Sequence, residues 1–318
     1  LSFDKQLWLR PEIVPGLKDI TDAVHEAGAA ASIQIGHCGN MTHYSTAGQI
    51  PIGPSTGINM YAYTPVRRMR KSEIEQVAKD FGRAIHTAHE AGFDCVEVHA
   101  GHGYLISQFL SPYTNHRRDE YGGSLDNRMR FMRMCMNEVM EAAAKTGTSV
   151  LVKHKMDDGF KSGIQIPESL EIAKVIESYG VDGIVLSSGF VSKAPMAVMR
   201  GLIPIYTMSY YMPLWLRYFV RWFGPVMIKQ FPFEENFFYQ NAMKFRKELK
   251  CPLVYVGSLV SREGIDKVLD SGFEMVQMGR ALVSEPDFVN RLAAEGADCR
   301  SRCDHKNYCI ARMYSVDM

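Results

Sequence analysis

Hydrophobic and polar positions follow one recurring order along the chain: an amphipathic helix, a glycine, and a short apolar run rich in β-branched residues. The clearest helix begins at Ser72, whose side chain is expected to cap the amide of Glu75 while Glu75 reaches back, forming a capping box. Apolar residues then recur every three or four positions and predict one buried face: Ile74, Val77, Phe81, Ala84, Ile85 and Ala88. Gly92 follows where helices commonly end in a left-handed residue, and a strand is predicted directly after it.

The same order predicts six strands, each shortly preceded by a glycine or a proline. They cover residues 32–35, 95–99, 150–153, 183–187, 253–257 and 275–279. Strands that alternate with helices form parallel sheets through right-handed crossovers. Eight such units close a (β/α)8 barrel, so the pattern predicts an α/β TIM barrel that lacks about two N-terminal strands.

The stretch over 190–238 departs from this order and is rich in aromatic side chains. We interpret it as a helical insertion packed on the barrel. The alternatives are a lid or wall of an apolar substrate pocket and a peripheral membrane contact aided by Arg217 and Arg221. The predicted organisation is a barrel domain over 1–290, which includes this insertion, and a cysteine-containing tail over 291–318.

Composition and charge narrow the class of protein. Of the 318 residues, 46% are hydrophobic and 22% charged, which is typical of a folded globular chain. The net charge of +1 gives no electrostatic basis for nucleic-acid binding. No run approaches the roughly 18 apolar residues of a membrane span, and Asp4, Lys5 and Arg10 are unlike a signal peptide. Seven cysteines, an odd number, argue against a disulfide framework, so we expect free thiols and a cytoplasmic location.

The segment after the second predicted strand carries the strongest candidate chemistry. His99, His102 and Tyr104 lie within six residues, and the glycines between them allow sharp turns. Two imidazoles can donate hydrogen bonds to a carbonyl oxygen as it gains negative charge, and a tyrosine hydroxyl can protonate a nearby carbon. A zinc site and a purely structural role are the rival interpretations, but no third zinc ligand is evident nearby. The pattern therefore predicts these three residues as catalytic and no metal.

Other strands supply candidate cofactor contacts. Gln34 lies in an otherwise apolar strand, where a buried amide needs partners such as a planar cofactor or backbone groups. Lys153 ends another apolar strand, so its charge needs an anion or a polarised cofactor nearby unless that strand end is solvated. The last two strands end in small residues that let backbone amides approach a phosphate, followed by an arginine that can bind it bidentately. These residues are Gly257, Ser258, Gly279 and Arg280.

With these residues, the chain resembles the old yellow enzyme family of FMN-dependent NAD(P)H:flavin oxidoreductases, in particular its bacterial enoate and dienoyl-CoA reductase-like branch. The resemblance extends from about Pro11 to Pro286 and is most specific over 96–112, which reads VEVHAGHGYLISQFLSP, and over 115–124 and 127–131. It implies FMN as cofactor and NAD(P)H as electron donor. The implied reaction passes hydride from the flavin to the alkene of an α,β-unsaturated carbonyl compound, such as an enoate, an enone or an enoyl thioester.

The resemblance also implies a role for each candidate. His99 and His102 are similar to the pair that binds the substrate carbonyl, and Tyr104 to the proton donor. Gln34 and Lys153 are similar to residues that hydrogen-bond the flavin ring. The implied phosphate site consists of Gly257, Ser258, Gly279 and Arg280.

The tail resembles the four-cysteine iron–sulfur region of the same branch, with Cys299, Cys303 and Cys309 as candidate ligands. A 4Fe–4S cluster normally needs four thiolates. Lys306 stands where one of them is expected, and no cysteine follows Cys309, so we do not expect an intact cluster.

Two other functions remain open: an amine dehydrogenase-like flavoenzyme, and an inactive barrel fragment associated with a partner protein or a membrane. The histidine pair favours a carbonyl compound, because it offers hydrogen bonds to an oxygen. We expect an apolar unsaturated carbonyl substrate, no nucleic acid and no transmembrane span. A homo-oligomer or an electron-transfer partner stays open, as do the particular alkene and the choice between NADH and NADPH.

Overall fold

The main sheet consists of six parallel strands. The computed structural model describes residues 6–59, 64–194, 200–210, 212, 214–227 and 231–311. The sheet order is β1-β5-β6-β7-β8-β9, which places β1 and β9 at its edges. The bounds are β1 (Ser32–Ile35), β5 (Cys95–His99), β6 (Ser149–Lys155), β7 (Gly183–Ser187), β8 (Leu253–Val256) and β9 (Met275–Gln277). All six strands predicted from the sequence are therefore present.

The sheet is curled, as a barrel requires. Gln277 of β9 donates from its Nε2 to Glu97 Oε1 of β5 over 3.2 Å, although three strands lie between them in the sheet order. Neighbouring strands are about 4.8 Å apart, so a flat sheet would hold these side chains much too far apart to bond. The inner surface of the curled sheet is therefore a shared space into which β5, β6 and β9 all send polar groups.

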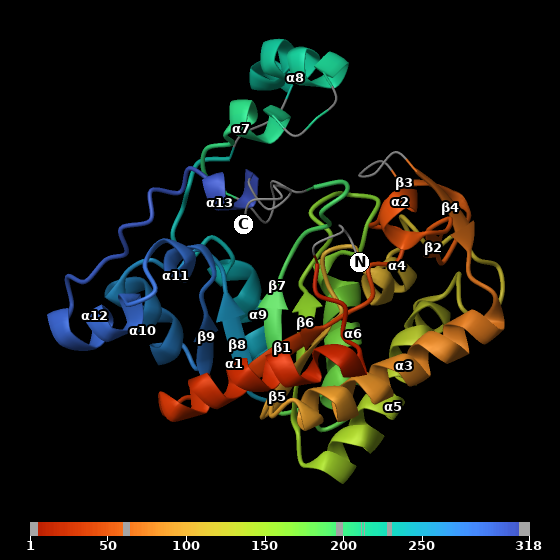
Figure 1. The fold of residues 1–318 in the computed structure, drawn as a ribbon, viewed down its shortest axis with the longest axis horizontal. Coiled ribbons are helices and arrows are strands. Elements are labelled where there is room, and N and C mark those ends of the chain that lie inside the picture. The colour runs from red at the N-terminus through yellow and green to blue at the C-terminus, as the bar shows by residue number, and fades with distance from the viewer. Residues whose placement is uncertain are drawn as a thin grey trace.

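Helices cover the outside of the sheet (Figure 1). A 3-10 turn (Pro11–Ile13) precedes α1 (Val14–Glu26), and α3 and α5 pack closely against each other. The other bounds are α2 (Tyr44–Ala47), α3 (Lys71–Glu90), α4 (Leu105–Leu110), α5 (Leu125–Thr146), α6 (Ile166–Glu177), α9 (Tyr239–Glu248), α10 (Arg262–Asp270), α11 (Arg280–Ser284), α12 (Phe288–Glu295) and α13 (Tyr308–Ala311). The core between helices and sheet is apolar, with Ile74, Ile85, Val96 and Phe131 all fully buried.

The helix predicted from Ser72 exists, but its N-terminal cap is not the predicted one. The α3 helix begins at Lys71, and Glu73 Oε2 accepts a hydrogen bond of 2.7 Å from the backbone amide of Arg70. Glu73 also forms a bidentate ion pair with Arg67, which lies in the strand before the helix. The prediction that Ser72 and Glu75 form the capping box is wrong, because tertiary contacts with that strand select a start one residue earlier. At the other end, Gly92 is left-handed as predicted, with φ of 86°.

A second, small sheet was not predicted. It has the order β2-β4-β3, with β2 (Ile52–Gly53), β3 (Gly57–Asn59) and β4 (Thr64–Arg68). These strands have two to five residues, and β4 contains a proline, so periodicity carries almost no signal for them. This sheet lies to one side of the barrel, beside α2 and α4 (Figure 1).

The aromatic insertion is helical, as predicted, and contains α7 (Ile205–Tyr210) and α8 (Leu214–Met227). It is not packed on the barrel, however, because α8 packs mainly against α7 and both helices stand apart from the barrel body (Figure 1). Parts of the insertion and residues 312–318 of the tail lie outside the described residues. Within the described part of the chain, no helix combines the length and apolarity needed to cross a bilayer.

All seven cysteines are free thiols. Cys38 and Cys135 are buried as expected, whereas Cys95 and Cys251 are only half-buried.

Candidate active site

The structure brings the three predicted catalytic side chains together. His99 is the last residue of β5, and the loop that follows turns back so that His102 and Tyr104 face it. The ring centroids of His99 and His102 are 5.1 Å apart, and those of His99 and Tyr104 are 4.6 Å apart. Two imidazoles and one phenol are thus clustered at the C-terminal end of a barrel strand, where barrel enzymes carry their active sites.

The loop that carries them is held on several sides. The backbone carbonyl of His102 accepts a hydrogen bond of 3.0 Å from the amide of Val191. The amide of Ala100 donates to the backbone carbonyl of Lys153 over 2.9 Å. Gly103 adopts a φ of 85°, and a Cβ there would lie 2.6 Å from the ring of Phe190. Only glycine meets both constraints, so the turn predicted from the glycines is required by backbone conformation and by close packing.

Both histidines are neutral near pH 7. Burial lowers the pKa of His99 well below its ordinary value, and the neighbouring His102 and Lys153 lower it further. Burial, together with Lys153 and Lys155, lowers the pKa of His102 to about 3. The amide of Gly101 points at His99 Nδ1 over 3.4 Å, an arrangement that places the proton of this neutral ring on Nε2. A neutral imidazole with one free N–H is a hydrogen-bond donor suited to a carbonyl oxygen.

Ser187, at the C-terminal end of β7, is a contact that the sequence did not indicate. Its Oγ lies 2.7 Å from His102 Nε2, and both groups can act as donor or acceptor. This bond fixes the orientation of the His102 ring. A serine at a strand end is too common to be singled out from sequence alone.

Lys153 belongs to a network of polar side chains inside the curled sheet. Its Nζ donates to Glu97 Oε2 over 3.0 Å and to Gln277 Oε1 over 2.7 Å. The counter-charge of Lys153 is Glu97, which the sequence analysis missed, and contact of Lys153 with a cofactor stays a prediction. The available signal was a charged residue at the centre of the apolar run Val96-Glu97-Val98.

Gln34 joins the same network, but it is not buried as predicted. Its Nε2 donates to Glu97 Oε2, and its side chain is exposed because β1 is an edge strand. Gln34 and Glu97 are register partners on adjacent strands, as are His99 and Lys153. The amide, the carboxylate and the ammonium therefore lie side by side next to the histidine pair.

The four residues predicted to bind phosphate lie after β8 and β9. Ser258 is left-handed, with φ of 55°, and its Oγ is buried without a hydrogen-bond partner among the described residues. A Cβ at Gly279 would meet no atom within 4 Å, whereas one at Gly257 would approach Phe238 to 2.9 Å. Arg280 is already engaged, since its Nη1 donates to the backbone carbonyl of Arg200 over 2.7 Å and to Asn307 Oδ1 over 2.5 Å. Phosphate binding by these residues stays a prediction.

The tail cysteines do not come together with further ligands. Cys299 is buried, and Cys303 and Cys309 are half-buried. Across the ranges that the structure describes, no three His, Cys, Asp or Glu side chains form a group that could hold a metal ion.

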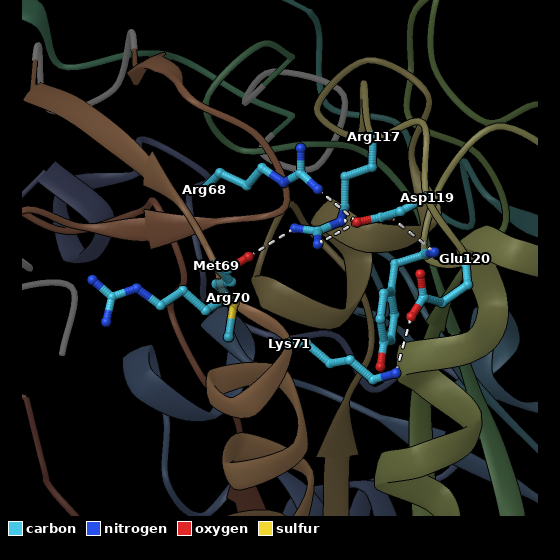
Figure 2. Close-up of a pocket in the computed structure, with 8 residues that line it drawn as sticks. Arg68, Met69, Arg70, Lys71, Arg117, Asp119 and Glu120 are labelled. Atoms are coloured by element: carbon cyan, nitrogen blue, oxygen red, sulfur yellow. Dashed lines mark hydrogen bonds and ion pairs between the residues drawn. The ribbon is translucent and has the colours of Figure 1, made fainter.

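A separate pocket of about 380 Å³ lies at the N-terminus of α3 (Figure 2). Five of the six charged side chains that line it are paired: Arg68 and Arg117 with Asp119, and Lys71 with Glu120. Arg117 is buried and also donates to the backbone carbonyls of Pro54 and Met69. This network braces the loop after the histidine segment, and none of the predicted site residues lines the pocket.

A curled parallel sheet with paired imidazoles, a phenol and an interior lysine at one rim is the architecture of a barrel flavoenzyme. The chain belongs to the NADH:flavin oxidoreductase / NADH oxidase family, whose model matches residues 4–200. This membership confirms the family predicted from the sequence, with FMN as its cofactor and NAD(P)H as electron donor.

Curated relatives and solved structures agree with this assignment. The chain is 37% identical over 303 residues to a 4,4'-dithiodibutanoate disulfide reductase from Rhodococcus erythropolis, covering 95% of this chain and 75% of that protein. The old yellow enzyme homologue from Zymomonas mobilis has the same fold, with a TM-score of 0.67 and 24% identity over 92% of this chain and 75% of that one. A 2-naphthoyl-CoA reductase gives a TM-score of 0.76 at 23% identity, over 95% of this chain but only 44% of its own.

The residues present fit FMN. A flavin ring needs hydrogen-bonding groups along one edge, and Gln34, Lys153 and Gln277 supply amides and an ammonium beside the histidines. A phosphate needs donors in an open space, and the unpartnered Ser258 hydroxyl and the open space at Gly279 offer them. Gln277, Ser258 and Gly279 lie at or just after the carboxyl ends of β9 and β8, whereas Lys153 lies two residues before the end of β6.

Proposed function

We propose that this chain reduces the carbon–carbon double bond of an α,β-unsaturated carbonyl compound: an enoate, an enone or an enoyl thioester. The observation that carries the proposal is the cluster of His99, His102 and Tyr104, in which two neutral imidazoles lie next to one phenol. An oxygen that gains negative charge during the reaction requires hydrogen-bond donors, and the pair supplies two from one loop.

Each side chain has a separate task in this reaction. His99 and His102 donate hydrogen bonds to the substrate carbonyl oxygen and stabilise the enolate that forms when hydride reaches the β-carbon. Tyr104 then donates its hydroxyl proton to the α-carbon. Bound FMN supplies the hydride, which it takes from NAD(P)H. Because the imidazoles are already neutral and held by the loop, they need no proton change or large reorientation to stabilise the enolate.

An aromatic cluster beside the histidine loop supports a bulky apolar substrate. Phe190, at the start of the insertion, packs against the loop at Gly103 and lies 5.8 Å from Tyr113 and 6.0 Å from Phe160, between ring centroids. Phe190 itself is fully buried, so the partly exposed rings of Tyr113 and Phe160 would form the wall for apolar groups next to the donors that would bind the carbonyl.

A second candidate is the reduction of an organic disulfide, which is favoured by the 37% identity to a disulfide reductase over 95% of the chain. Two electrons cleave the S–S bond and leave two thiolates, which take up protons from water at neutral pH because a free thiol has a pKa of about 8.5. No proton has to be delivered to carbon. Alkene reduction therefore requires Tyr104 as a proton donor, whereas disulfide reduction does not.

Replacement of Tyr104 by Phe tests the proposal. It should slow alkene reduction about 100-fold, because only the proton donor is lost, while FMN content and the rate of flavin reduction by NAD(P)H stay unchanged. Stopped-flow absorbance of the flavin, with 2-cyclohexenone or an aromatic disulfide as oxidant, measures each half-reaction separately.

The matched control is Tyr179→Phe, which removes a hydroxyl that donates to the Arg133 carbonyl outside the proposed site and should leave both half-reactions intact. An unchanged alkene rate in Tyr104→Phe would exclude Tyr104 as the proton donor. If the wild-type protein reoxidises rapidly with the disulfide and not with any enone, the second candidate replaces the first.

A further inference from the structure

The helices α7 and α8 carry a large exposed apolar surface that the proposed reaction does not use. They stand apart from the barrel body in Figure 1 and connect back to it through the segments between β7 and β8. The most exposed side chains are at the end of α8, where Trp222 retains 78% of its accessible surface and Val226 retains 90%. Contiguous apolar surface of this kind is uncommon on a free protein surface and indicates a binding face.

The exposed residues of α8 form two adjacent rows along one side of the helix. Leu214, Tyr218, Trp222 and Val226 recur at intervals of four, which places them in one row. Phe219, Phe223 and Met227 form the next row, and the first two rings are 5.1 Å apart between centroids. We refer to these two rows as the α8 face.

The polar side of α8 is turned inward, the reverse of an ordinary surface helix. Arg221 Nε donates to Ser209 Oγ of α7 over 3.0 Å, and its guanidinium lies 5.6 Å from the Tyr206 ring centroid. Arg217 contacts Tyr210 in the same way, at 5.1 Å from the ring centroid. The arginines therefore hold α8 against α7 and leave the α8 face directed away from the rest of the chain.

The charge of the surrounding segment is strongly one-sided. From residue 183 to residue 233 the sequence has five basic residues and no acidic one: Lys193, Arg200, Arg217, Arg221 and Lys229. One of them, Arg200, is paired with Glu234, which follows this range directly. The whole chain has a net charge of only +1, so the remainder of the chain is net negative. The α8 face is thus an apolar and aromatic surface within a cationic segment.

We propose that the α8 face binds the surface of an anionic lipid bilayer. Tryptophan, tyrosine and phenylalanine favour the boundary between headgroups and acyl chains, and nearby basic residues are attracted to anionic headgroups. A helix of 14 residues is about 21 Å long, too short to span the roughly 30 Å hydrocarbon core, so α8 lies in the interface plane.

A second copy of the chain fits this face less well. Two copies would bring two cationic segments near each other, and Glu234, the acidic residue next to the segment, is already paired with Arg200 of the same chain. A bilayer supplies both an apolar boundary and phosphate groups. The charge distribution therefore favours lipid over self-association.

When the α8 face contacts the bilayer, the end of the barrel from which the insertion leaves, at the carboxyl end of β7, is directed toward the membrane. The insertion joins β7 to β8, and His102 pairs with Ser187 at the end of β7 and bridges to Phe190 at the start of the insertion. The proposed catalytic loop is thus tied directly to the root of the lipid-binding segment. This inference extends beyond the proposed reaction and does not depend on which substrate is reduced.

Vesicle sedimentation of the FMN-loaded full chain tests the proposal. Wild-type protein should pellet with vesicles of phosphatidylcholine and 30% phosphatidylglycerol far more than with pure phosphatidylcholine, and added salt should reduce the bound fraction. The double variant Trp222→Ser/Val226→Ser should lower the partition coefficient at least tenfold, because it removes the two most exposed apolar groups of the face.

The matched control is Trp8→Ser/Ile58→Ser, which removes a tryptophan and a β-branched residue of similar exposure, 61% and 70%, outside the α8 face. It should bind vesicles as the wild type does. Unchanged flavin absorbance and far-UV circular dichroism verify that both variants are folded. Equal binding by the wild type and the α8 variant would overturn the proposal. Absence of vesicle binding, with a wild-type dimer that the α8 variant dissociates in light scattering, would overturn it in favour of self-association.

Discussion

At the scale of single residues, the ion pair between Glu97 and Lys153 contributes to the stability of the barrel interior. The side chains of Glu97 and Lys153 are 5% and 10% exposed, and their charged atoms are 3.0 Å apart. Gln34 and Gln277 complete the hydrogen bonding of the carboxylate. A buried pair of this kind stabilises little when intact, but removal of one partner leaves an uncompensated charge in a medium of low polarity.

Replacement of Glu97 by Gln should therefore destabilise the fold by about 3 kcal/mol, because the Lys153 ammonium loses its counter-charge while the shape of the side chain is conserved. Urea denaturation at one fixed, saturating FMN concentration measures the change. The double variant Glu97→Gln/Lys153→Met should recover part of the loss, since it removes the unpaired charge as well. Equal stability of Glu97→Gln and the wild type would show that the pair is not energetically coupled.

At the scale of elements, α3 shows how a tertiary contact shifts a helix start. Glu73 binds both the Arg70 amide and the Arg67 guanidinium, and these contacts, the Arg67 hydrogen bond above all, lower the pKa of its carboxyl group to about 2. Glu73→Gln should cost about 1 kcal/mol of unfolding free energy, because glutamine can still accept from the Arg70 amide but loses the charge that pairs with Arg67. Ser72→Ala, at the position that local pattern would choose, should cost almost nothing, because that side chain is exposed. Thermal denaturation of the two variants compares them, and the reverse order of effects would restore Ser72 as the cap.

The long elements could be predicted from the sequence, and the short ones could not. Six strands and α3 carry apolar patterns that repeat over several residues, so the burial of one face selects their conformation. The strands β2, β3 and β4 exist because β4 pairs with both neighbours, for example through Ile52 with Arg67 and Ile58 with Pro65. Pairing between segments is a tertiary property, and no local pattern records it. Where a helix packs is likewise a tertiary property. The apolar residues of α8 were therefore expected to pack on the barrel, but they lie exposed.

At the scale of the whole molecule, the candidate site is assembled by the curl of the sheet. The histidines and Tyr104 were identifiable because they are close in sequence, between residues 99 and 104. Glu97, Ser187 and Gln277 contribute from three different strands, and only the closed geometry brings them to Lys153 and His102. Ser187 and Gln277 have their partners 85 and 124 positions away, so neither has a local signature.

The buried histidines also set how the whole fold responds to acid. Burial holds the pKa of His154 at about 4 and that of His99 well below its ordinary value, whereas both titrate near 6.5 in the unfolded chain. Their stabilising contribution is complete above pH 6.5 and is lost as the pH falls, because the unfolded state binds protons that the folded state does not. An imidazole that stays neutral in the folded state lowers the free energy of unfolding by about 1.4 kcal/mol for each pH unit below 6.5. His99 and His154 together should therefore lower it by roughly 3 kcal/mol between pH 7.5 and pH 5.5.

Urea denaturation at pH 7.5 and at pH 5.5 tests this expectation. The variant His154→Gln should lose less stability between these two pH values than the wild type does, by the contribution of one imidazole, whatever its stability at pH 7.5. The rate of alkene reduction per folded molecule should stay nearly constant over the same range, because the pKa of His102, about 3, keeps this donor neutral throughout. A rate that falls with an apparent pKa near 6.5 would contradict the neutral imidazole pair. Constant stability from pH 7.5 to 5.5 would instead show that the buried imidazoles find compensating partners, so the two measurements separate the chemistry of the site from the stability of the barrel that holds it.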